Sequence, residues 1–81
     1  MSKKQAPTRF RNIDSLLKGN GDVTIGRIGA ARCAATASDG DQPLAMLVRR
    51  PRESLEELLE RLDAAIGKAW DDEEYTDEIN G

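Results

Sequence analysis

Few side chains in this sequence could act as a nucleophile, a general base or a metal ligand. Cys33 is the only cysteine, and the chain contains no histidine. A cysteine nucleophile needs a neighbouring base to withdraw its proton, and zinc sites built from cysteine and histidine need about four ligands. Neither arrangement can form within one chain, so Cys33 is interpreted as a small core residue on a predicted strand.

Carboxylate pairs are the remaining candidates for acid–base chemistry. Glu56 and Glu60 stand one helical turn apart, and Asp72 and Glu73 are adjacent. Such pairs become useful when a cleft shifts their pKa values, and a domain of this size has little room for one. We therefore expect solvated carboxylates, and the sequence predicts no enzyme, no catalytic residue, no metal site and no cofactor.

One stretch has the spacing of a phosphate-binding loop. Gly21–Ile28 follows the Walker A pattern with two departures. Arg27 stands where the pattern has lysine, and Ile28 stands where a serine or threonine would hold magnesium. No strand is predicted before it and no helix after it, so the glycines are interpreted as turn and close-packing positions.

Charge is divided unequally along the chain. Residues 1–52 contain 10 Lys and Arg against 4 Asp and Glu, a net +6, whereas residues 53–81 contain 2 against 11, a net −9; the sum is the overall −3. A separation of this kind is typical of proteins that bind an oppositely charged partner.

The leading hypothesis is a small non-enzymatic interaction or regulatory protein that binds a protein partner, expected to be basic, through the acidic end of its long helix and its tail. Tyr75 and Ile79 would be the apolar anchors. The predicted partner-binding residues are Trp70, Asp71, Asp72, Glu73, Glu74, Tyr75, Asp77, Glu78 and Ile79.

The alternative function is binding of nucleic acid through phosphate contacts. Its candidate residues lie in the N-terminal arm and after the third predicted strand: Lys3, Lys4, Arg9, Arg11, Arg49, Arg50 and Arg52. Aromatic platforms for single strands are scarce, since the chain has one Phe, one Trp and one Tyr. Three other interpretations stay open: a basic edge strand protected from pairing by its charge, an acidic tail that increases solubility without binding a partner, and an acidic tail folded back on these basic residues.

Two family resemblances concern the order of elements. The predicted order of helix, three strands and helix is similar to the double-stranded RNA-binding domain, although Glu53, Glu56 and Glu57 replace that family's basic residues at the start of the second helix. The run from residue 44 to residue 70, with its capped-helix junction at 53–58, resembles HicB-type antitoxins, in which a small sheet is backed by one amphipathic helix.

These residues must be positioned by a fold that the sequence predicts to be α+β. A short helix is expected over 12–17 with Asn12 as N-cap, followed by strands over 23–27, 32–37 and 44–49. Alanines are poor strand formers, so residues 30–37 stay open between strand and helix. Ser54 and Glu57 form a capping box that begins a long amphipathic helix ending at Trp70.

The expected organisation is a flexible basic arm over 1–11, one α+β domain over 12–70 and an acidic tail over 71–81. The long helix should lie across a three-stranded antiparallel sheet, where Ala35, Ala37 and Ala45 would allow close approach. Glu57 and Arg61 are expected to form an ion pair one helical turn apart, and Gly67 is expected on the polar side of the helix.

Length and composition set the cellular expectations. A chain of 81 residues forms one domain, and small domains without disulfides or metals often gain stability by association, so a homodimer is left open. The unpartnered cysteine and the absence of a signal peptide or a long apolar run favour a cytoplasmic, non-membrane protein. The excess of Arg over Lys, 8 against 4, favours a bacterial origin.

Overall fold

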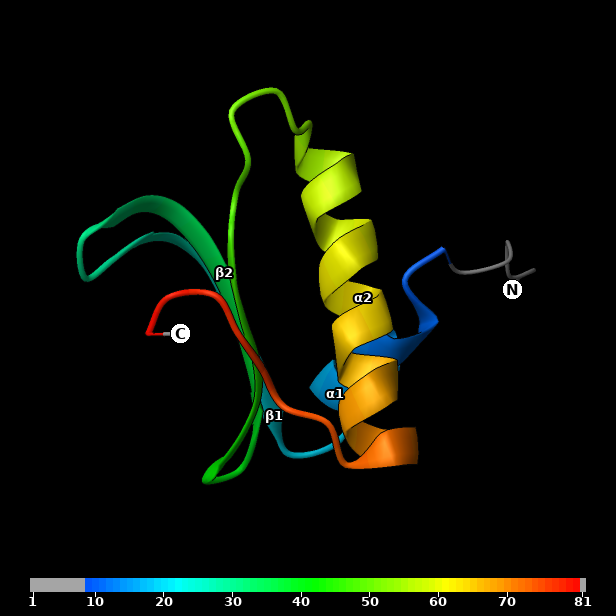
Figure 1. Cartoon of the computed structure of the whole chain (residues 1–81). Coiled ribbons are helices and arrows are strands. Elements are labelled where there is room, and N and C mark those ends of the chain that lie inside the picture. The colour runs from blue at the N-terminus through cyan, green and yellow to red at the C-terminus, as the bar shows by residue number, and fades with distance from the viewer. Residues whose placement is uncertain (1–8, 81) are drawn as a thin grey trace.

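The computed structural model describes residues 9–80 and has the α+β class that the sequence predicts (Figure 1). Its elements are α1 (Arg11–Lys18), β1 (Gly21–Ile28), β2 (Ala31–Asp39), β3 (Gln42–Val48), α2 (Leu55–Asp72) and β4 (Thr76–Asp77).

The strands form one sheet in the order β1-β2-β3-β4. The first three make an antiparallel meander in which Ile25 lies opposite Ala35, and Ala35 lies opposite Leu47. β4 runs parallel to β3 and places Thr76 beside Ala45. The prediction of three strands is therefore one strand short, because a two-residue strand is too brief to produce an alternating pattern.

Residues 31–37, which the sequence leaves open between strand and helix, form most of strand β2. Ala30 lies in the turn with Gly29, whose φ of +59° is the left-handed conformation that glycine adopts readily. Ala34, Ala35 and Ala37 are buried in the centre of the sheet, between β1 and β3. Hydrogen bonding of β2 to β1 on one side and to β3 on the other outweighs the helix propensity of these alanines.

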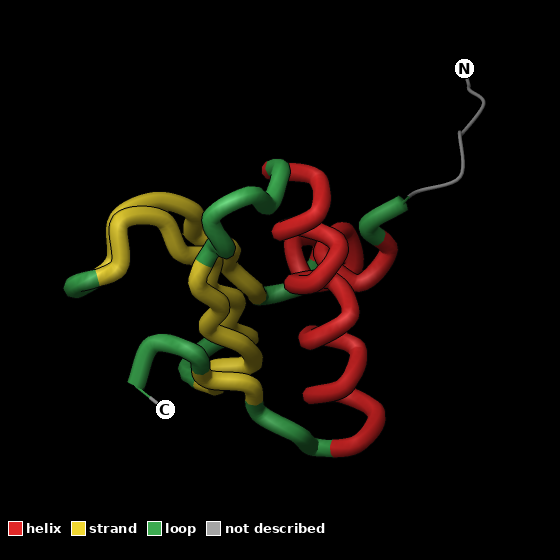
Figure 2. Tube along the Cα trace, turned by 45° about the horizontal axis from the view of Figure 1, so that its top comes forward, coloured by secondary structure: helices red, strands yellow, loops and turns green. Residues whose placement is uncertain are grey.

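Both helices cover the same face of the sheet, with α2 over β2 and β3 and α1 against β1 (Figure 2). The largest fully buried side chains are Leu16, Leu47, Leu58, Leu62 and Ile66. The three alanines expected to admit the helix are confirmed as core residues, with exposures of 0% for Ala35, 2% for Ala37 and 0% for Ala45. The helix can thus approach the sheet closely.

The start of α2 is the predicted capping box. Ser54 Oγ accepts a hydrogen bond from the Glu57 N–H at 3.0 Å, and Glu57 Oε1 accepts one from the Ser54 N–H at 2.8 Å. The helix ends at Asp72, two residues beyond the expected end. No helix in the described part of the chain combines the length and apolar character needed to cross a membrane.

α1 begins at Arg11, and Asn12 is not its N-cap, contrary to the expectation. Asn12 lies inside the helix and donates from Nδ2 to the Asp63 carbonyl oxygen at 3.0 Å and to Asp63 Oδ2 at 3.2 Å. The other carboxylate oxygen, Oδ1, accepts from the Ile13 N–H at 2.9 Å. A side chain of α2 therefore satisfies the free N-terminal amide of α1, a partner that local sequence cannot reveal.

Gly67 faces α1, not solvent, which corrects its expected position on the polar side. A Cβ atom at Gly67 would lie 2.8 Å from Asn12 Nδ2. A side chain at Gly67 would therefore displace the Asn12 amide at the point where the two helices touch.

Candidate protein-interaction groove

A groove of 440 Å³ lies between the turn joining β2 to β3 and the C-terminal end of α2. Its lining residues are Asp39, Gln42, Pro43, Leu44, Ala69, Trp70, Glu73 and Tyr75. Both charged residues among them, Asp39 and Glu73, are acidic. The groove thus combines apolar walls with a negative electrostatic potential.

Two aromatic side chains are presented at this groove. Trp70 is 38% exposed and Tyr75 is 45% exposed. The Tyr75 hydroxyl donates to Met46 Sδ at 2.9 Å, which holds the ring against β3. Partial burial raises the pKa of that hydroxyl, and the charge of Asp77 adds to the shift, so Tyr75 stays protonated at neutral pH. Partly exposed aromatic rings of this kind are typical anchors in binding surfaces.

The end of α2 concentrates negative charge beside the groove. Asp71 and Asp72 are its last residues, and Glu73 follows in the left-handed conformation with φ 57° and ψ 35°. The helix is closed by the Glu74 N–H, which donates to the Lys68 carbonyl oxygen at 3.3 Å. Carboxylates at a helix C-terminus are disfavoured by the helix dipole, which is also negative there. The arrangement weakens the helix end but strengthens the potential that a cationic ligand would meet.

The part of the tail beyond the groove is docked on the sheet. After β4, the Glu78 N–H donates to the Met46 carbonyl oxygen at 2.7 Å. Asp77 Oδ1 accepts from the Ile79 N–H at 3.0 Å and the Asn80 N–H at 2.9 Å. These bonds, above all the one from Asn80, lower the pKa of Asp77. They also turn the chain away from the edge of β3.

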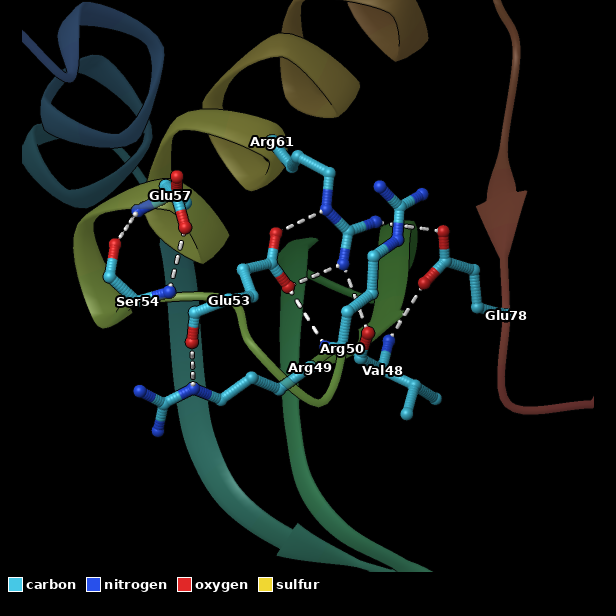
Figure 3. Close-up of polar contacts among 8 residues, drawn as sticks. All are labelled: Val48, Arg49, Arg50, Glu53, Ser54, Glu57, Arg61 and Glu78. Carbon is cyan, nitrogen blue, oxygen red and sulfur yellow. Dashed lines mark hydrogen bonds and ion pairs between the residues drawn. The ribbon is translucent and has the colours of Figure 1, made fainter.

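Arg61 joins this docked segment to the rest of the fold (Figure 3). Its guanidinium donates to both carboxylate oxygens of Glu53, at 2.6 Å and 2.9 Å, to Glu78 Oε2 at 2.9 Å and to the Val48 carbonyl oxygen at 2.9 Å. Glu78 Oε1 in turn accepts from the Val48 N–H at 2.9 Å. Arg61 is thus occupied by Glu53 and Glu78, while Glu57 serves the capping box, and the expected Glu57–Arg61 pair is wrong.

Glu53 is the most strongly shifted carboxylate in this cluster. Its side chain is 6% exposed, and the hydrogen bonds from Arg61 lower its pKa to about 2. The Arg50 N–H also donates to Glu53 Oε1, at 3.0 Å. Glu53 therefore stays ionised at any physiological pH and holds the segment between β3 and α2 in one conformation.

The predicted partner-binding residues divide into three groups. The groove is lined by Trp70, Glu73 and Tyr75. Exposed carboxylates at the same end of the molecule are Asp71, Asp72 and Glu74. The residues engaged in β4 and the turn after it are Asp77, Glu78 and Ile79. The helix end and the tail are therefore parts of one folded surface.

Five exposed arginines gather at the opposite end of the sheet. Arg27 and Arg32 flank the turn of the β1–β2 hairpin, and Arg49, Arg50 and Arg52 lie between β3 and α2. The Arg49 N–H donates to the Cys33 carbonyl oxygen at 3.0 Å, which places the two segments side by side. This group is called the arginine end below.

The remaining residues of the nucleic-acid alternative lie elsewhere. Lys3 and Lys4 are outside the described residues. Arg9 is held by Glu56 at 3.0 Å and by Glu60, while the exposed Arg11 begins α1. Among residues 9–80, the ion pairs formed by basic side chains use Arg9, Lys18, Arg61 and Lys68, and none of them uses a member of the arginine end.

The residues considered for catalysis, phosphate binding or metal binding do not come together as a site in the described part of the chain. Gly21–Ile28 is the edge strand β1, not a loop that leads into a helix. Cys33 is partly buried on β2. Within residues 9–80, no three acidic or cysteine side chains converge as metal ligands would. Glu56 and Glu60 hold Arg9, so their carboxylates already have a partner.

Sequence reasoning missed parts of both ends of the molecule. Asp39, Gln42 and Pro43 flank the turn between β2 and β3, and nothing local in the sequence indicates that this turn lies against the end of α2. Arg27 and Arg32 were left out of the basic set, although the predicted hairpin would have placed them near the end of the third strand. An antiparallel register drawn from the alternation of residues was the available signal.

No protein-family model, no curated protein and no solved structure matches this chain. The resemblances to the double-stranded RNA-binding domain and to HicB-type antitoxins therefore stay predictions about the order of elements. The functional argument depends on the groove and the arginine end alone.

Proposed function

We propose that this chain is a non-enzymatic interaction protein that binds an arginine- or lysine-rich segment of a partner in the groove at the end of α2. One observation carries the proposal: Trp70 and Tyr75 are partly exposed in a groove whose charged lining residues are all acidic. No catalytic step, metal or cofactor is part of this function.

The groove offers a basic segment two kinds of contact. A guanidinium or ammonium group over the indole of Trp70 would gain a cation–π interaction, which indole provides best among the aromatic side chains. The carboxylates of Asp39 and Glu73 would accept charge-assisted hydrogen bonds from the same segment. The further carboxylates at the helix end would accelerate association more than they would tighten the complex.

Trp70 is the only tryptophan, so its fluorescence reports on this groove without a label. We expect a short peptide of alternating arginine and glycine to change the Trp70 emission saturably, and a glutamate–glycine peptide to leave it unchanged. The double variant Asp39→Asn/Glu73→Gln should weaken binding on the order of tenfold. The matched control Glu56→Gln/Glu60→Gln removes the same charge far from the groove and should bind as the wild type does.

A Trp70→Ala variant, followed by anisotropy of a labelled peptide, tests the aromatic contribution separately. Equal weakening by the groove variant and by the control variant would show that only net charge attracts the peptide. That result would contradict a binding site at the groove.

The arginine end supports a second candidate function, binding of nucleic acid phosphates. Arg27 and Arg32 join Arg49, Arg50 and Arg52 in a group of five basic side chains, none of which forms one of the ion pairs of residues 9–80. The logarithm of the affinity for a duplex should then fall linearly with the logarithm of the salt concentration, with a slope of about −0.9 per neutralised phosphate. Arginine substitutions should weaken this binding more than removal of residues 71–81.

A further inference from the structure

The molecule carries opposite charges at its two ends. The base of the β1–β2 hairpin lies beside the segment between β3 and α2, because the Arg49 N–H donates to the Cys33 carbonyl oxygen. The β2–β3 turn and the end of α2 lie at the opposite end, where both line the groove (Figure 1). The 18 residues of α2 separate the ends by about 27 Å along the helix axis. The arginine end contributes five positive charges, and the groove end contributes Asp39, Asp41, Asp71, Asp72, Glu73 and Glu74.

The acidic side chains closest to the arginine end are engaged inside the fold, and ion pairs offset part of their charge. Glu53 is paired with Arg61, Glu57 closes the capping box, and Glu60 holds Arg9. A groove of 580 Å³ beside them is lined by Arg50, Arg52, Glu53, Glu57, Glu60, Arg61 and Ala64. Arg9 and Arg61 offset two of the five glutamates near this end, which are Glu53, Glu56, Glu57, Glu60 and Glu78. Three uncompensated glutamates therefore stand against five arginines, and the net charge of the arginine end stays positive.

We infer that the basic partner of the groove is a second copy of this chain, whose arginine end enters the groove of the first. This inference rests on the proposed function and names its ligand. The complementarity is direct: exposed guanidinium groups that lie outside the ion pairs of residues 9–80 meet an acidic groove with an exposed indole. Each copy carries one such end and one such groove, and the two lie at opposite ends of the molecule.

The contact joins different surfaces of the two copies and is therefore heterologous. Copies add head to tail, forming a ring if the rotation closes and an open chain if it does not. The attraction is between exposed charges, so it should weaken as salt shortens the Debye length.

Analytical ultracentrifugation of nuclease-treated full-length protein tests this inference. At about 50 mM salt we expect the weight-average mass to rise with protein concentration above the monomer mass of 8.9 kDa, and at about 500 mM salt we expect it to return to that mass. The control variant Arg11→Gln/Lys18→Gln removes two positive charges from α1 and should associate as the wild type does.

Two variants that each remove one end make the test specific. Arg27→Gln/Arg32→Gln/Arg52→Gln keeps only the groove, and Asp39→Asn/Trp70→Ala/Glu73→Gln keeps only the arginine end. Each should remain monomeric alone. Their mixture should form a one-to-one complex of twice the monomer mass and nothing larger, because each copy then has a single functional end.

Three outcomes would overturn the inference. The first is a wild-type protein that stays monomeric at low salt while its groove binds the arginine peptide, which would leave the proposed function standing. The second is association that disappears on nuclease treatment, which would favour the nucleic-acid function. The third is two end variants that self-associate alone or fail to form a complex when mixed.

Discussion

Arg61 Nε lies 2.6 Å from Oε2 of Glu53, and Arg61 Nη2 lies 2.9 Å from the other oxygen of the same carboxylate. This bidentate ion pair connects Glu53, the residue before the capping box, with Arg61 in the second turn of α2. It also leaves Arg61 Nη1 free to hold Glu78 at 2.9 Å. One guanidinium thereby fixes the angle between β3 and α2 and secures the segment that completes the sheet.

Acid should destabilise the protein through Glu53. The pKa of Glu53 is lowered from 4.5 to about 2 in the folded state, so the unfolded chain takes up the proton first. The stabilisation from this group is present above pH 4.5 and is lost as the pH falls toward 2. Urea unfolding of wild type and Glu53→Gln should show a difference in stability that is largest at neutral pH and shrinks in acid. A difference that stayed constant down to pH 2 would be inconsistent with this assignment.

Loss of the Glu78 carboxylate should loosen the outer edge of β3. The Val48 N–H donates to Glu78 Oε1, so Glu78→Ala removes its acceptor and should lower stability by about 1–2 kcal/mol. Hydrogen exchange at the Val48 amide should accelerate. Glu78→Gln keeps an acceptor oxygen at that position and should retain most of the protection. Unchanged exchange at Val48 in Glu78→Ala would show that the bond contributes nothing.

Gly67 and Asn12 should be coupled. Gly67→Ala favours the helix by about 1 kcal/mol, but its Cβ would displace Asn12 Nδ2 from its bonds to Asp63. We expect Gly67→Ala to destabilise the wild type by about 1 kcal/mol and to stabilise an Asn12→Ala background by a similar amount. A double-mutant cycle, with the free energy of unfolding of each variant measured in urea, gives the coupling energy between the two positions. Additive effects would mean that the two helices do not touch as described.

Enlarging a sheet alanine should push α2 away from the sheet. Ala45 is 0% exposed beneath the helix, so Ala45→Val should cost about 1–3 kcal/mol. Ala64→Val adds the same two methyl groups on the exposed side of α2 and should cost less than about 1 kcal/mol. Thermal or urea unfolding distinguishes the two. Equal costs would contradict close packing at Ala45.

The elements with a strong local signal were predictable from the sequence. The capping box at Ser54 and Glu57 marks the start of α2, and the Asp-Gly turn at 39–40 separates two strands, because both signals act over a few residues. The class of the fold and the alanine contact surface followed from the same patterns. β2 stayed undecided because its alanines acquire strand geometry only through pairing with neighbours on both sides.

The features that sequence reasoning missed depend on contacts between distant residues. Asp63 caps a helix 50 residues earlier, and Arg61 pairs with residues before and after α2. β4 exists because the edge of β3 offers it hydrogen bonds, not because Thr76 and Asp77 favour a strand. Glu73 was predicted as a binding residue from its place in the acidic C-terminal segment, whereas Asp39 and the turn that forms the other wall required the folded chain.

The bond from the Ile13 N–H to Asp63 also has a consequence for the order of folding. α1 has 8 residues, too few to be stable as an isolated helix, and its capping group belongs to α2. The meander is built from neighbouring hairpins, which close short loops and form early. α1 can therefore consolidate only after α2 is in place, so substitutions in α1 should accelerate unfolding and leave the rate of folding nearly unchanged.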